Sequence, residues 1–152
     1  MSGAADTHRR REDLFFEILP FGLLVLSAAV SAAILWEEHS TLVAVVALSA
    51  AAAAWVAWWM PLHPAWRERP WPMAGFVAGY LGLLAALISL APWFGFAVFA
   101  AYFYVGRVPR PLQPVAAACT AVLVGTAQSG GWPGTEDAAA PGIWLALVAV
   151  NL

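Results

Sequence analysis

The chain alternates between long apolar runs and short polar or proline-rich segments. Its longest apolar run, residues 71–106, contains no charged side chain. One helix of about 36 residues would be far longer than the apolar core of a bilayer, which is about 30 Å thick. Pro92 lies within the run, and proline followed by Trp-Phe-Gly predicts a tight turn. We therefore predict two helices here, over residues 71–91 and 93–106.

Four other apolar runs flank this central pair. The first follows three arginines and continues past the point at which a signal peptide would be cleaved, so we expect it to be retained. The last would reach only about 18 Å at helical rise. We expect either that this helix is short and partly inserted or that the chain is a fragment. The sequence predicts an all-α integral membrane protein, a bundle of five complete transmembrane helices and a sixth, truncated one, at residues 14–36, 41–60, 71–91, 93–106, 112–127 and 141–152.

The distribution of charge predicts the topology. Two helices in the central run place all seven arginines on one side of the membrane, whereas a single helix would divide them. Cytoplasmic loops are enriched in basic residues. We therefore expect a multi-pass plasma-membrane protein with residues 1–13 as a frayed cytoplasmic tail. The outer connections then carry four acidic residues, Glu37, Glu38, Glu136 and Asp137.

The composition supports the membrane class and excludes others. The 152-residue chain is 62% hydrophobic and 11% charged, whereas soluble domains contain about 25% charged residues. It has no lysine and a net charge of -2, so we expect no nucleic-acid partner. The single cysteine, Cys119, excludes a disulfide framework, and we expect it to be a small buried residue of a helix. His63, between two prolines, is expected to be an exposed loop residue.

No catalytic, cofactor-binding or metal-ligating motif is present, so we predict that this chain is not an enzyme and has no cofactor. The outward polar residues are the ones with sensing chemistry. Glu37, Glu38 and His39 could meet Glu136 and Asp137 in a cation or proton sensor, because histidine changes charge near physiological pH. Solvated turns have the same composition, and that alternative stays open.

Small residues one turn apart allow membrane helices to approach closely. Gly75 and Gly79 have this spacing in the third run, as do Ser27 and Ser31 in the first. We expect these residues to pack the bundle internally, with dimerisation as the alternative. Glu17, at the edge of the first run, is expected at the interface; a proton-coupling carboxylate within the membrane is the alternative.

Aromatic side chains gather at several run ends. Trp55, Trp58 and Trp59 end the second run, where indole rings favour the headgroup level. Eight aromatic residues of the central run could line a ligand pocket between helices, although such residues more often face lipid. They are Tyr80, Trp93, Phe94, Phe96, Phe99, Tyr102, Phe103 and Tyr104.

The order of these segments carries a resemblance to a known family. The chain contains RRREDLFFEILPFGLLVLSAAVSAAILW, then PWPMAGFVAGYLGLLAALISLAPWFGFAVFAAYFYVG, then a GRVPRP loop and a final run ending WLALVAVNL. In its hydrophobic pattern and the order of its loops, it resembles the membrane-embedded N-terminal region of actinobacterial-type sensor histidine kinases. These belong to the class that pairs with LuxR/NarL-type response regulators. In that family a kinase core with a phosphoacceptor histidine and ATP-binding boxes follows the membrane bundle, and this chain contains no such core.

The resemblance implies that the chain is the membrane input region of a two-component kinase. It would act as a homodimer in the lipid bilayer and reach a response regulator only through a missing kinase part. The stimulus would be membrane thickness, an apolar ligand or an outer cation, relayed through helix repacking. The alternative is a small self-contained multi-pass membrane protein, either a transporter or an accessory subunit.

Overall fold

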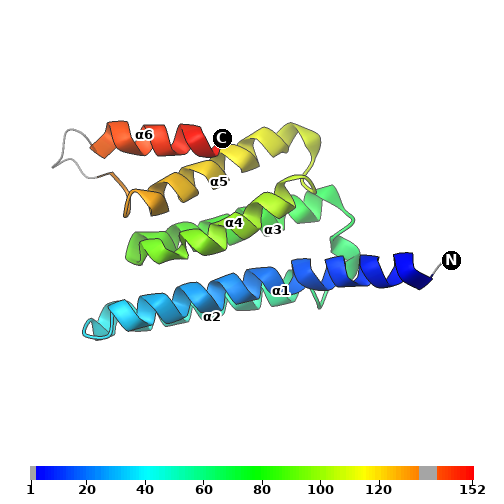
Figure 1. Cartoon of the computed structure of the whole chain (residues 1–152), viewed down its shortest axis with the longest axis horizontal. Helices are drawn as coiled ribbons and strands as arrows, with labels where there is room; N and C mark the ends of the chain where they lie inside the picture. Colours follow the sequence, from blue (N-terminus) through cyan, green and yellow to red (C-terminus); the bar gives the residue numbers. More distant parts are fainter. Residues whose placement is uncertain (1–2, 134–139) are drawn as a thin grey trace.

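The computed structural model describes residues 3–133 and 140–152, with side chains from residue 18 onward, and these residues form helices and turns with no strand. Successive helices run in opposite directions (Figure 1). Short 3-10 turns with a proline in their first positions connect several of them. The helices are α1 (Gly3–Ile34), α2 (His39–Trp59), α3 (Pro70–Leu90), α4 (Gly95–Val105), α5 (Gln113–Gln128) and α6 (Ala140–Asn151).

The prediction of an all-α chain with six helices is confirmed. The central run divides as predicted, because the 3-10 turn Pro92–Phe94 separates α3 from α4. The N-terminus differs from the prediction. Helix α1 begins at Gly3, within the segment that we expected to be frayed.

The prediction of five complete spans is not confirmed. Among the described residues, only α2 and α3, with 21 residues each, are long and apolar enough to cross a membrane. Helices α4, α5 and α6 have 11, 16 and 12 residues, or about 17, 24 and 18 Å at helical rise. Helix α4 is shorter than predicted because the turn Pro92–Phe94 takes the first residues of its apolar run.

The six helices form three layers (Figure 1). Helices α1 and α2 lie on one side, α3 and α4 in the middle, and α5 and α6 on the other side. Helix α1 packs against α2 and α4, α2 packs against α3, and α5 packs against both middle helices. Helix α6 packs mainly against α5. The core therefore lies around α3 and α4.

Aromatic side chains fill much of this core. Phe76 and Tyr104 meet edge to face with ring centroids 5.1 Å apart, and Phe76 stacks on Tyr80 at 5.8 Å. The hydroxyl of Tyr80 donates a hydrogen bond to the carbonyl oxygen of Ala97 at 3.0 Å. This bond satisfies a buried polar group and ties α3 to α4.

The charged side chains lie at the two ends of the bundle. From residue 18 onward, every described Asp, Glu or Arg lies in a connection between helices. The connections 60–69 and 106–112 share one end of the bundle, and the turn 35–38 lies at the other (Figure 1). The first end carries Arg67, Arg69, Arg107, Arg110 and Glu68, and the second carries Glu37 and Glu38.

Two residue-level expectations are wrong. Cys119 lies in α5 as expected, but it is exposed on the surface of the bundle. His63 lies in a loop, but it is half-buried: its ring stacks on Trp66 at 4.1 Å, and its Nδ1 lies 2.7 Å from the carbonyl oxygen of Trp58. Neighbouring tryptophans hold this loop residue against the end of α2.

Candidate functional site

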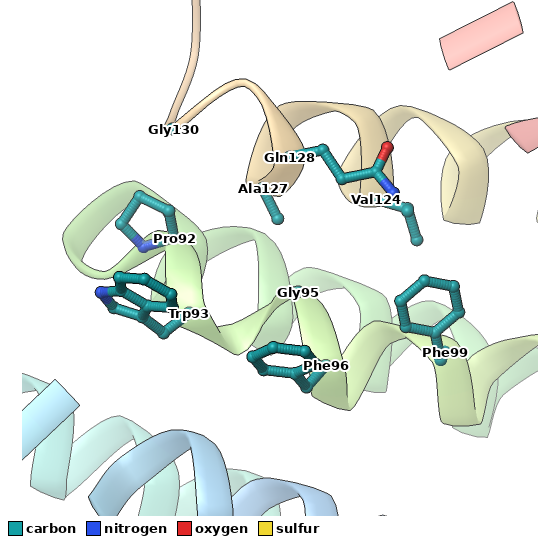
Figure 2. Close-up of a pocket in the computed structure, with 9 residues that line it drawn as sticks. All are labelled: Pro92, Trp93, Gly95, Phe96, Phe99, Val124, Ala127, Gln128 and Gly130. Carbon is teal, nitrogen blue, oxygen red and sulfur yellow. The ribbon is translucent and has the colours of Figure 1, made fainter. Parts of the chain in front are cut away.

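A groove of about 560 Å³ lies between α4 and α5. It is found at the end of the bundle where the turn Pro92–Phe94 and the C-terminus of α5 meet. Figure 2 shows the Phe99 ring of α4 pointing toward Val124 of α5, with the rings of Trp93 and Phe96 farther from α5. The lining residues are Pro92, Trp93, Gly95, Phe96, Phe99, Val124, Ala127, Gln128 and Gly130.

The sequence of α4 explains the shape of the groove. Phe96 and Phe99 are three residues apart on α4, so they lie on one side of the helix, and Trp93 precedes them in the turn Pro92–Phe94. Trp93, Phe96 and Phe99 remain partly exposed, at 46%, 47% and 42%. At Gly95 the two helices come together, since a Cβ there would lie 2.5 Å from the Cβ of Ala127. Close contact at one point and large rings beside it leave an open apolar channel.

A polar link connects the groove to α6. The side chain of Gln128, which lines the groove, accepts a hydrogen bond at Oε1 from Nδ2 of Asn151 at 2.9 Å. The backbone carbonyl of Asn151 accepts a hydrogen bond from the hydroxyl of Tyr102 at 2.7 Å. Asn151 therefore joins the last turn of α6 to both helices that form the groove.

The groove is lined mostly by apolar side chains. Gln128 and the indole of Trp93 supply the only polar side-chain atoms among the lining residues, and none of these residues is ionisable. Catalysis would require convergent acid, base or metal groups. The described residues contain no group of three or more His, Cys, Asp or Glu that could hold a metal ion. The arrangement can enclose an apolar group and orient one polar end.

The predicted sensing residues lie away from this groove or outside the described residues. Glu37 is in the turn after α1, Glu38 precedes α2, and His39 is its first residue; all three are exposed. Glu136 and Asp137 lie outside the described residues, so the predicted meeting of the two loops stays a prediction.

Gly75 and Gly79 face α2 within the same chain. A Cβ on Gly79 would lie 2.6 Å from Cε2 of Trp55, and one on Gly75 would lie 3.7 Å from the Trp59 ring. The indole nitrogen of Trp55 donates to the carbonyl oxygen of Phe76 at 3.1 Å. The glycine pair therefore provides space for two tryptophans of α2.

The eight aromatic residues of the central run divide into groups. Trp93, Phe96 and Phe99 line the groove. The other five either lie in the core or lie elsewhere on α4. Tyr80, Phe94 and Tyr104 are buried, Tyr102 bonds to α6, and Phe103 is half exposed.

Sequence reasoning missed the contribution of α5 and α6. Val124 and Ala127 were treated as the end of an ordinary apolar run, and Gln128 as the start of the loop that follows it. Asn151 carried a usable signal, because a carboxamide in an otherwise apolar helix is costly in a membrane and needs a partner. Comparisons with protein-family models, curated proteins and solved structures gave no match to this chain.

Proposed function

We propose that this chain is the membrane-embedded input region of a two-component sensor histidine kinase. An apolar molecule that enters the α4–α5 groove would change how α6 packs, and α6 would pass that change to a kinase part. Homodimerisation and contact with a response regulator belong to the same proposal. The way in which α6 is attached supports the proposed signalling mechanism. The exposure of α2 supports the placement of the chain in a membrane.

The exposure of α2 is hard to reconcile with a water-soluble fold. A helix that is apolar on all faces is expected either in a protein core or in lipid. Only 17% of the most apolar 18-residue window of α2 is buried, compared with 44% for α3. Protein contacts therefore do not account for the apolar surface of α2, and a lipid environment would.

Helix α6 is attached mainly to α5. Its one fully buried residue is Val148, which rests against Gly125 of α5. Hydrogen bonds add to this contact: Trp144 Nε1 donates to Oγ1 of Thr126 at 2.9 Å, and Asn151 makes the bonds described above. Hydrogen bonds between membrane helices contribute only about 0.6 kcal/mol on average. Such a helix can change its packing at a modest free-energy cost.

The proposed mechanism begins at Gln128. Gln128 lines the groove and accepts the hydrogen bond from Asn151. A molecule that fills the groove would displace the Gln128 side chain from this position. Loss of that bond favours packing states in which the end of α6 has moved. The stimulus would thus act by changing the populations of two helix arrangements.

The coding sequence that follows the codon for Leu152 tests the proposed assignment most directly. We expect it to continue into a cytoplasmic helix with a histidine followed by an acidic residue, and then into Asn- and Gly-rich ATP-binding boxes. A stop codon with no kinase gene nearby would contradict the assignment. A self-contained transporter or accessory subunit would then be the better account.

Autophosphorylation of the full-length kinase tests the mechanism. We expect Asn151→Ala and Gln128→Leu to shift basal activity in the same direction, each by about threefold, the equivalent of about 0.6 kcal/mol. Val150→Ala is the matched control, because Val150 is an exposed neighbour on the same helix. Equal effects of all three substitutions, or no effect of any, would contradict a role for the Gln128–Asn151 link.

A further inference from the structure

A second groove, of about 160 Å³, lies between α3 and α5 at the opposite end of the bundle from the first. Its walls are apolar, and its opening between the helices is lined by small side chains of alanine and cysteine. Val108 and Leu112, from the connection between α4 and α5, close its end. Along the helices it is lined by Ala74, Val77, Ala78 and Leu81 of α3 and by Val115, Ala116 and Cys119 of α5.

The groove is open to the surroundings of the bundle. Ala78 and Cys119 line it and are both exposed. Alanine and cysteine are too small to fill the space between two helices, so a slot remains where larger side chains would have met. In a membrane, this slot would face lipid chains.

Three arginines flank the residues and elements that form the closed end of the groove. Arg107 directly precedes Val108, and Arg110 begins the turn that includes Leu112. Arg69 directly precedes α3, whose early turns form one wall. These three arginines are exposed, and the described part of the chain offers none of them an acidic partner or hydrogen-bond acceptor.

The loop that carries two of these arginines is held in place. Nε2 of Gln113 donates to the carbonyl oxygens of Val108 at 3.0 Å and Gly106 at 3.3 Å. Val108 itself is 4% exposed. In the connections 60–69 and 106–112, Glu68 is the one acidic residue, and it lies beside Arg69. These two connections therefore carry a net positive charge, and the backbone around Val108 is fixed.

We propose that the α3–α5 groove binds an anionic phospholipid. One acyl chain would lie between Ala78 and Cys119, and the phosphate would lie against Arg107 and Arg110, with Arg69 nearby. Guanidinium groups match the geometry of phosphate oxygens, and arginines beside a membrane attract anionic lipids. A free phosphate ion has no apolar part that could occupy the slot. This inference rests on the membrane placement in the proposed function and is independent of any kinase.

Titration of phosphatidylglycerol into the detergent-solubilised chain, followed by native mass spectrometry, tests the site. Phosphatidylcholine with the same acyl chains is the reference lipid. We expect phosphatidylglycerol to bind more tightly, and Arg107→Gln to weaken it about fivefold, since each basic residue near the surface contributes about 1 kcal/mol. Arg107→Gln combined with Arg110→Gln should weaken it about 25-fold.

A groove-filling variant separates a lipid site from a simple anion site. Ala78→Phe should weaken phosphatidylglycerol binding at least tenfold. Ala86→Phe is the matched control on α3, since Ala86 is also exposed but does not line the groove. Circular dichroism of each variant checks that its helix content is unchanged.

Three outcomes would overturn the lipid site. They are equal binding of the two lipids, no difference between the two phenylalanine variants, or competition by inorganic phosphate that Ala78→Phe leaves unaltered. Extraction of the membranes with alkaline carbonate is carried out first. Release of the chain at that step contradicts the membrane placement, whereas a chain that stays integrated but does not select phosphatidylglycerol contradicts the lipid site alone.

Discussion

At Gly79 the interface between α2 and α3 leaves no room for a side chain. The indole of Trp55 lies over this residue, and a Cβ would be 2.6 Å from its Cε2 atom. The ring cannot move away freely, because its Nε1 donates to the carbonyl oxygen of Phe76. Small residues at helix contacts let backbones approach, and here the space holds a ring from the neighbouring helix.

Replacing Gly79 by alanine should therefore destabilise the bundle. Alanine favours a helix over glycine by about 1 kcal/mol, but overpacking against Trp55 costs about 1–3 kcal/mol. Gly82→Ala gains the same helix propensity with nothing within 4 Å of the new Cβ. Reversible unfolding in mixed micelles should show Gly79→Ala below Gly82→Ala in stability by about 1–3 kcal/mol. Equal stabilities would contradict a rigid Trp55–Gly79 contact.

The sequence showed how residues are spaced along these helices, but not which side of the helix faces a neighbouring helix. The separation of Gly75 and Gly79 indicated a packing face, but it could not identify Trp55 as the neighbour. Cys119 was expected to be buried and is exposed. A helix that is apolar on every side has no polar face to show which residues point outward, so burial could not be read from its sequence.

At the scale of elements, α5 and α6 come closest at Gly125. A Cβ on Gly125 would lie 2.7 Å from Cγ2 of Val148 and 2.9 Å from its backbone nitrogen. The backbone of α6 therefore lies directly against α5 at this point. Val148 is the one described residue of α6 that is fully buried, so this contact is the tightest part of the α5–α6 interface.

Gly125→Ala should loosen α6 while leaving the middle layer intact. Overpacking of about 1–3 kcal/mol at this contact corresponds to amide exchange about 5- to 150-fold faster in α6. Hydrogen exchange followed by mass spectrometry can measure α6 and α3 in the same sample. Gly142→Ala, on α6 with nothing within 4 Å of its Cβ, is the control. Equal acceleration in α3 would indicate general unfolding and contradict independent movement of α6.

The helices themselves were largely predictable, because proline and glycine mark their ends. Pro92 separated α3 from α4 as predicted. The extension of α1 to Gly3 was missed, because its charges were interpreted as a solvated tail, although Arg and Glu are good helix formers. The aromatic residues of the central run indicated a possible pocket between helices, and three of them line the α4–α5 groove. Its position was not predictable, since it depends on how two apolar helices diverge from the contact at Gly95.

At the scale of the whole molecule, the two ends of the bundle differ in charge. The arginines of the connections 60–69 and 106–112 lie at one end, and Glu37 and Glu38 lie at the other. Cytoplasmic loops of membrane proteins are enriched in basic residues. In the topology expected from the sequence, the arginine-bearing end therefore faces the cytoplasm.

Cysteine accessibility in intact cells should detect this orientation. In a Cys119→Ala background, Glu37→Cys should react with a membrane-impermeant maleimide, because the turn after α1 is expected outside. Glu68→Cys should react only after permeabilisation, since α2 alone separates it from Glu37 in sequence. The two substitutions are matched, because both replace an exposed glutamate in a connection.

A third position tests whether the short helix α4 crosses together with α3. Gly106→Cys places a thiol at an exposed site where a Cβ meets nothing within 4 Å. If α3 and α4 both cross, Gly106→Cys must behave like Glu68→Cys, because two crossings return the chain to the same side. If Gly106→Cys is labelled from outside like Glu37→Cys, only one of the two helices crosses, and the arginines lie on both sides. Because α4 would reach only about 17 Å, an internal thiol at Gly106 would require the bilayer to thin around α4 or the α3–α4 turn to lie below the outer surface.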